Sequence, residues 1–196
     1  MLSGLENFNF DVLYILSQIF ALAGMIFSLV AVQQRKKIQL LNYDVVGSAC
    51  AMLHYVCLGA WSGVASKAIS LIRNIIAGYG DAHQKKFSKK WLVLFAIIFV
   101  SFYIIGGIIA YESMFSLLPA IGAAIYTAVL YLGKVKAVRY ASGLASIMWL
   151  IYNIHVFSIV GIISESVFIV NDVVAIWRYR KKRGKNQKKS RQKRKK

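Results

Sequence analysis

The sequence is poor in the residues from which most soluble active sites are built. Its 196 residues include 7 acidic side chains, 3 histidines, 2 cysteines and a single proline, Pro119. Cys50 and Cys57 share one apolar stretch, and such a pair makes neither a disulfide framework nor a metal site. No histidine pair has a metal-ligand spacing, and no Ser-His-Asp or paired-carboxylate arrangement stands out. We therefore expect a protein that is not an enzyme and that uses no metal or cofactor.

Apolar residues are abundant instead, and 58% of the chain is hydrophobic. A helix needs about 20 mostly apolar residues to cross about 30 Å of hydrocarbon. Helices are expected because each one satisfies its own backbone hydrogen bonds within lipid. The sequence therefore predicts an all-α integral membrane protein. Its seven transmembrane helices are expected at residues 12–33, 40–59, 63–80, 91–111, 114–133, 140–157 and 160–178.

The 25 Lys and Arg residues gather in every second connection between these helices. The clusters are residues 35–37, 85–90, 134–139 and 178–196. Cytoplasmic loops of membrane proteins carry this excess of positive charge, so we expect the N-terminus outside and the C-terminus inside. Only Lys67 and Arg73 lie away from the clusters. The remaining connections, which lie on the other side of the membrane, are predicted to contain Lys67 and the acids Glu6, Asp11, Glu112 and Glu165.

The chain also aligns with itself when it is shifted by 98 residues. The shift places Gly24 on Gly122, Lys36 on Lys134, Ser48 on Ser146, Gly63 on Gly161, Ser66 on Ser164 and Ala77 on Ala175. A unit of three helices ends on the side opposite to its start, so a further helix is needed before a second unit can run parallel. This predicts two parallel three-helix repeats joined by a linker helix, a 3+1+3 arrangement known from transporters.

The predicted organisation has six parts. They are an external N-terminus (1–11), a first repeat (12–80), a basic cytoplasmic loop (81–90), a linker helix (91–111), a second repeat (114–178) and a disordered basic cytoplasmic tail (179–196).

Several short motifs have counterparts in a known family. They are Ala31-Val32-Gln33-Gln34-Arg35-Lys36, His54-Tyr55, Leu58-Gly59-Ala60-Trp61-Ser62-Gly63 and Ile72-Arg73-Asn74. With them the chain resembles the YgjV-type bacterial inner-membrane proteins, which are placed near the SWEET and PQ-loop group. The resemblance implies a multi-pass protein of the bacterial inner membrane, and it allows a homo-oligomer. The Pro-Gln pair of PQ-loop proteins is replaced by Val32-Gln33 and Leu130-Tyr131, so the proline hinges of SWEET-type proteins are not carried over.

The resemblance also indicates a candidate site. In the SWEET-type architecture asparagines of spans three and seven line the central solute site, which by position would be Asn74 and either Asn171 or Asp172. Arg73 and Asp172 lie at comparable depth in the two repeats, so an ion pair between them is a natural hypothesis. The alternatives are a structural lock between the repeats, or an Arg73 side chain that extends to the cytoplasmic surface.

Other polar groups lie nearer the outer ends of the predicted helices. Tyr55 and Asn153 correspond under the 98-residue shift and could grip a solute, or they could belong to an interfacial aromatic belt. His54 and His155 could couple solute movement to protons, although a lone histidine more often simply hydrogen-bonds a neighbour.

The basic tail has no aromatic residue after Tyr179 that could stack on bases. An anchor on anionic lipid head groups is therefore favoured over nucleic acid or a ribosome. The leading hypothesis is a small-solute transporter or facilitator with a central polar site. The rival is a non-transporting scaffold or insertase-like protein whose tail docks anionic lipid, ribosomes or acidic partners.

Overall fold

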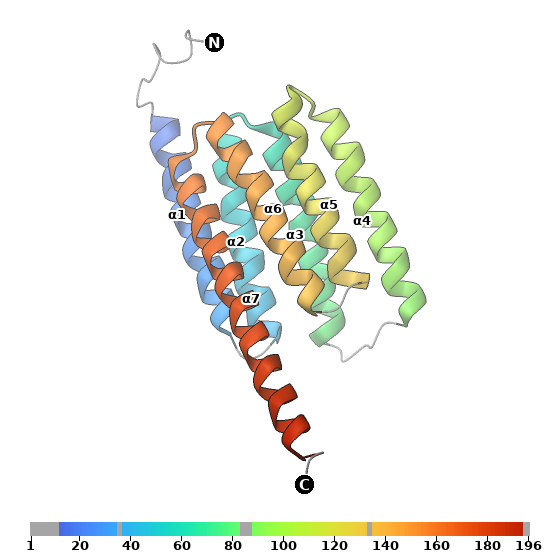
Figure 1. Ribbon diagram of the computed structural model, residues 1–196. Helices are drawn as coiled ribbons and strands as arrows, with labels where there is room; N and C mark the ends of the chain where they lie inside the picture. Colours follow the sequence, from blue (N-terminus) through green and yellow to red (C-terminus); the bar gives the residue numbers. More distant parts are fainter. Residues whose placement is uncertain (1–11, 35–36, 83–87, 133–134, 194–196) are drawn as a thin grey trace.

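The computed structural model describes residues 12–34, 37–82, 88–132 and 135–193, and these residues form seven α-helices and one short 3-10 helix (Figure 1). The elements are α1 (Val12–Gln33), α2 (Lys37–Cys57), α3 (Trp61–Ala82), α4 (Lys89–Ile109), η1 (Met114–Ser116), α5 (Leu117–Leu132), α6 (Val135–His155) and α7 (Ile159–Lys193). The prediction of an all-α protein with seven main helices is confirmed.

Four of the helical segments are long and apolar enough to cross a membrane. They are Val12–Ala31, Lys89–Ile109, Met114–Leu132 and Ile159–Trp177. The helices α2, α3 and α6 have 21 or 22 residues, which at 1.5 Å per residue also gives a length of about 30 Å. Their sequences are more polar, and together they carry half of the polar and charged side chains that are buried in the described part of the chain.

Polarity is reversed relative to a water-soluble domain. Large apolar side chains such as Ile97, Ile109 and Val170 are more than half exposed, whereas Arg73 is only 6% exposed. An apolar outer surface around buried polar groups is suited to a lipid environment, in which polar groups must find partners inside the protein.

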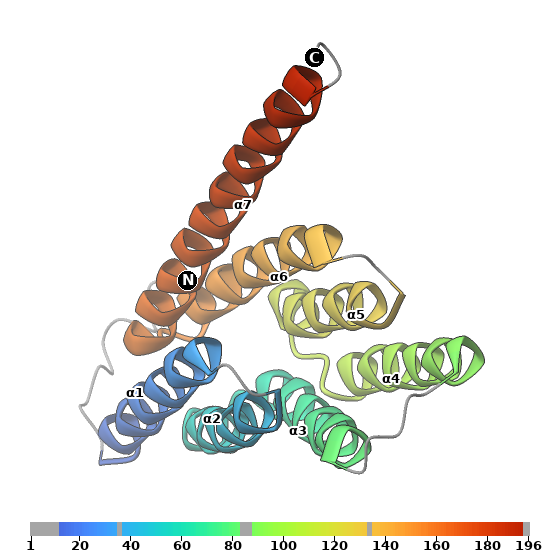
Figure 2. The ribbon, with the colours of Figure 1, turned by 90° about the horizontal axis from the view of Figure 1, so that it is seen from below.

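The helices form a closed ring in the order α1, α2, α3, α5, α6, α7, as the end-on view in Figure 2 shows. Within the ring α1–α2–α3 and α5–α6–α7 each pack as consecutive neighbours. The two groups meet where α3 packs on α5 and where α7 packs on α1. Helix α4 lies outside this ring, against α5 and α3.

Two helical hairpins close with the same backbone geometry at the end of the bundle opposite the C-terminus (Figure 1). Gly59 and Phe157 both have positive φ, at 66° and 54°. After each of them the next amide donates a hydrogen bond back into the preceding helix, Ala60 N to Tyr55 O and Ser158 N to Asn153 O, both at 2.9 Å. A non-glycine residue with positive φ is uncommon, so the second hairpin keeps this turn without the help of a glycine.

Helix α7 is longer than the sequence predicts. It continues to Lys193 and projects beyond the rest of the bundle (Figure 1), where a disordered tail was expected from residue 179. Lys, Arg and Gln have favourable helix propensities, and no proline follows in the chain to stop the helix. The predicted external N-terminus, residues 1–11, lies outside the described residues.

Candidate functional site

Each of the helices α2, α3, α6 and α7 carries four residues that are spaced by four, three and four positions. This spacing places the four residues on one face of their helix. We call these sixteen residues the central column. They are Asp44, Ser48, Ala51 and Tyr55 on α2; Gly63, Lys67, Ser70 and Asn74 on α3; Ser142, Ser146, Trp149 and Asn153 on α6; and Gly161, Glu165, Phe168 and Asp172 on α7. All of them are buried or half-buried.

We name the layers of the column by their distance from the α2–α3 and α6–α7 turns: the outer layer is nearest these turns and the inner layer is farthest from them. The outer layer joins α2 to α6. The Tyr55 hydroxyl donates a hydrogen bond to Asn153 Oδ1 at 2.9 Å, and the two residues are 3% and 1% exposed. Both were candidates for a solute site or for an interfacial belt, and their burial makes the belt interpretation wrong. The second amide atom, Asn153 Nδ2, has no hydrogen-bond partner among the described residues.

Glycines make this close approach of the helices possible. A Cβ atom on Gly63 would lie 2.7 Å from the Tyr55 ring, and one on Gly161 would lie 2.5 Å from Asn153 Oδ1. The backbone N–H of Gly63 also donates to the Tyr152 hydroxyl at 3.1 Å. The two small residues therefore let α3 and α7 lie directly against the polar side chains of α2 and α6.

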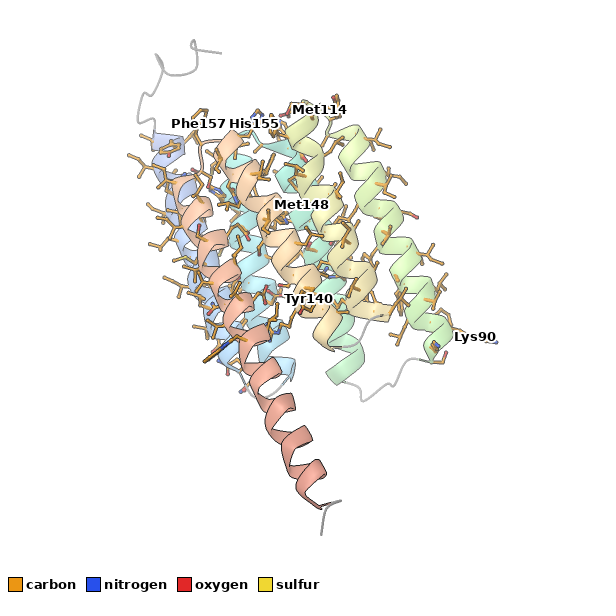
Figure 3. The ribbon with its side chains drawn as sticks, viewed as in Figure 1. Lys90, Met114, Tyr140, Met148, His155 and Phe157 are labelled. Carbon is orange, nitrogen blue, oxygen red and sulfur yellow. The ribbon has the colours of Figure 1, made fainter. Side chains whose placement is uncertain are left out.

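His54 also lies at the outer end and is 2% exposed. Its Nδ1 lies 2.8 Å from the carbonyl oxygen of Ser17 on α1, and its Nε2 lies 2.9 Å from the Ser158 hydroxyl at the start of α7. This ring therefore connects three helices. His155 is different, because it is exposed beside Ser113 and stacks on Phe115 with ring centroids 4.8 Å apart (Figure 3).

The middle layer holds two opposite charges. Lys67 Nζ lies over the Trp149 ring, 4.2 Å from its centroid. Glu165, which is 8% exposed, accepts a hydrogen bond from the Ser146 side chain and interacts electrostatically with Lys67. Tyr55 and Tyr152 pack against Trp149, with ring centroids 5.5 and 6.0 Å from it. The layer thus combines a cation, an anion and an aromatic wall.

The inner layer is a hydrogen-bonded network around Arg73. Its guanidinium donates to Thr127 Oγ1 on α5 at 2.7 Å and to Asn74 Oδ1 at 3.1 and 3.2 Å. Asn74 in turn donates from Nδ2 to Asp44 at 2.6 Å. The guanidinium also lies 5.4 Å from the Tyr126 ring centroid. The Arg73 side chain is therefore held inside the bundle and does not extend to its surface, and it links α3 to α5.

The predicted ion pair between Arg73 and Asp172 is wrong. Asp172 pairs with Arg139 on α6 at 3.3 Å, while Arg73 uses Thr127 and Asn74. Helix α7 packs along α6, which carries Arg139, so equal depth along the bundle did not determine which side chains meet. Asn171 and Asp172 were alternative site residues. Asn171 is exposed, so Asp172 is the one that belongs to the column.

Sequence reasoning missed Lys67 and Glu165 as members of the site. Both were assigned to outer connections, but α3 begins at Trp61 and α7 at Ile159, so each charge lies six residues, or about 9 Å, inside its helix. The 98-residue shift could have found them, because it places Lys67 on Glu165. Tyr126 and Thr127 gave no comparable signal.

The charges of these layers balance. Lys67, Arg73 and Arg139 face Asp44, Glu165 and Asp172, so three cations are matched by three anions. Within the described residues no group of His, Cys, Asp or Glu could hold a metal ion. The arrangement can bind and desolvate a polar solute, because it offers donors, acceptors and an aromatic face inside an apolar bundle.

Comparison with known proteins agrees with a bundle that lies in a membrane. No curated protein and no solved structure matches the chain. The sequence profile of one family, described as "Bacterial inner membrane protein", matches residues 15–183, which is most of the chain. The chain therefore belongs to the Imp-YgjV family of bacterial inner membrane proteins.

Proposed function

We propose that this protein is a small-solute transporter or facilitator whose solute site is the middle layer of the central column. The observation that carries the proposal is the pair Lys67 and Glu165, placed opposite an aromatic wall inside the bundle. Charged groups at membrane depth are costly, and they usually mark a solute or ion pathway. A scaffold would gain nothing from two charges that form no direct ion pair.

The proposal includes two parallel three-helix units, α1–α3 and α5–α7, with α4 as the linker. The equivalent turns at Gly59 and Phe157 support it, because these residues are separated by the same 98 positions as Tyr55 and Asn153. The helix contacts support it too. A twofold axis through the ring would exchange the α3–α5 contact with the α7–α1 contact.

All seven helices would span the bilayer, with the N-terminus outside and the C-terminus in the cytoplasm. Lys90 lies at the end of the bundle from which α7 projects, and His155 and Phe157 lie at the opposite end (Figure 3). The basic connections expected from the sequence would then all be cytoplasmic, in agreement with the positive-inside rule.

Alternating access requires contacts between the units that can open at one end at a time. At the outer end Tyr55–Asn153 and His54–Ser158 join the units. Toward the inner end the joining contact is Arg73–Thr127. A rocking motion would break one of these sets while the other holds, and the solute would be exposed to each side in turn.

The test is uptake by liposomes that contain the full-length protein. The probes are radiolabelled pools of amino acids, sugars and nucleosides, compared with protein-free liposomes. We expect saturable uptake of at least one pool. Trp149→Leu should reduce it about tenfold or more because Trp149 forms the wall of the site, whereas Trp91→Leu, at a position 55% exposed on α4, should leave it unchanged. Absence of uptake from every pool would overturn the proposal.

Residues 181–196 separate this function from the scaffold alternative. This segment continues α7 beyond the bundle through Lys193, where its lysines and arginines could bind anionic lipid. Deleting it should leave uptake intact and weaken only attachment to anionic lipid. Loss of uptake in a deletion variant that still folds and reconstitutes would favour the scaffold.

A further inference from the structure

The two charges of the middle layer are close enough to interact but are not paired directly. Among the described residues no hydrogen bond or ion pair is formed by the Lys67 ammonium group, which lies over the face of Trp149 and interacts at longer range with Glu165 and Asp44. Glu165 is coupled to Lys67 electrostatically, and its hydrogen bond comes from Ser146. A lysine and a glutamate in a dry interior normally close into an ion pair, because separated charges are poorly compensated there.

A third polar group is left without a partner in the adjacent layer. Asn153 lies one turn from Trp149 on the same face of α6 and is 1% exposed. Its Oδ1 accepts the Tyr55 hydroxyl, while its Nδ2 has no partner among the described residues. A buried amide donor without an acceptor destabilises a protein unless a ligand or water uses it.

These groups have a definite chemistry. Lys67 and Asn153 Nδ2 can donate hydrogen bonds to an anionic group, and Glu165 can accept them from a cationic group. The rings of Tyr55, Trp149 and Tyr152 supply an apolar surface between the outer and middle layers. The charges of the site sum to zero, so a solute without net charge would leave this balance intact.

We infer that the middle layer binds a zwitterionic solute such as a free amino acid, with its carboxylate at Lys67 and Asn153 and its ammonium at Glu165. The inference rests on the proposed transport function and names its substrate class. The solute would form an ion pair with each of the two charges, which do not pair with each other directly. An α-amino acid carries both groups on a single carbon atom, Cα, and its side chain packs against the aromatic wall.

Other solute classes fit less well. A simple carboxylate would neutralise Lys67 and leave Glu165 uncompensated, and a simple amine would do the reverse. A sugar could use the hydroxyl and amide groups, but it would leave both charges without a partner of opposite sign. The specificity of the site would thus come from the free-energy cost of the buried charge that each of these ligands leaves uncompensated.

The test is ligand-induced thermal stabilisation of the full-length protein in lipid nanodiscs. A ligand that binds only the folded protein raises its melting temperature. The probes are each of the common amino acids, glucose, propionate and propylamine. We expect stabilisation by at least one amino acid and by none of the other three compounds. Stabilisation by glucose, propionate or propylamine alone, or by no compound, would overturn the inference.

The decisive variant neutralises both charges together, Lys67→Met with Glu165→Gln. Removing both members of a buried charge pair leaves no uncompensated charge, so this variant should fold. It should lose the amino-acid stabilisation, with affinity falling about tenfold or more. Trp61→Leu, at an exposed position of α3, is the control that should keep it. Unchanged amino-acid affinity in the folded double variant would contradict the inference.

The same assays separate this inference from the proposed function. Uptake of sugars or nucleosides by liposomes, together with no amino-acid binding, would retain transport and overturn the zwitterion assignment. Absence of uptake and of stabilisation would overturn both.

Discussion

Tyr55 and Asn153 are 98 residues apart in the sequence, and their buried side chains hydrogen-bond to each other at 2.9 Å. The same 98-residue separation relates Gly63 to Gly161, and each of these glycines packs on one member of the pair. One pair of corresponding positions therefore meets in space, and a second pair packs on the two members of the first. That is the geometry expected when two similar units face each other across a twofold axis.

The first prediction concerns this hydrogen bond. Tyr55→Phe removes the donor to Asn153 Oδ1 and leaves a buried amide with neither of its atoms engaged, which should cost about 1–3 kcal/mol of stability. The measurement is reversible unfolding in detergent, followed by circular dichroism. Tyr43→Phe, at a position 37% exposed on the same helix, is the matched control and should have little effect.

A second substitution makes the test specific. Asn153→Leu in the Tyr55→Phe background removes the orphaned amide, so it should recover most of the lost stability. A double variant that is less stable than Tyr55→Phe would show that the amide is satisfied in another way.

The second prediction concerns the glycines that bring the helices together. Gly63→Ala places a methyl group 2.7 Å from the Tyr55 ring and should destabilise the protein by about 1–3 kcal/mol through overpacking. Gly143→Ala is the control, because its nearest neighbour is Asp172 Cβ at an ordinary 3.9 Å. In an open helical position alanine is favoured, so that variant should gain up to about 1 kcal/mol. Equal melting temperatures for the two variants would argue against close packing at Gly63.

The third prediction concerns the inner network. Thr127→Val keeps the shape of the side chain but removes the acceptor of the Arg73 guanidinium, and hydrogen bonds to charged groups are worth about 1.5–3 kcal/mol. We expect a destabilisation of this size. Ser166→Ala is the control, since its hydroxyl donates to a carbonyl of its own helix at an exposed position. A Thr127→Val protein as stable as the wild type would mean that Arg73 readily finds another acceptor.

The residues of the site show what a sequence can and cannot provide. The helical spans and the correspondence of Tyr55 with Asn153 could both be predicted, because apolar runs and an internal repeat can be read along the sequence alone. Partners could not. Asp172 contacts Arg139 rather than Arg73, because partner choice depends on which helices are neighbours and how far each side chain reaches.

Lys67 and Glu165 illustrate a second limit. Their charge suggested positions in loops, since charges are rarely placed at membrane depth. The structure places them inside α3 and α7, where each is coupled to the other. The expectation of a disordered tail had a similar origin, because composition alone cannot show that α7 continues to Lys193.

The last prediction is the topology. In a background with Cys50→Ala and Cys57→Ala, single cysteines are introduced by Met114→Cys and Lys90→Cys, at exposed positions near opposite ends of the bundle (Figure 3). A membrane-impermeant maleimide added to intact spheroplasts should label Met114→Cys. It should label Lys90→Cys only after the membrane is permeabilised, because the basic ends of the helices remain in the cytoplasm. The reverse pattern would invert the topology, and labelling of both sites in intact spheroplasts would exclude a single orientation. Met114 is 81% exposed, so burial within the protein does not prevent its labelling.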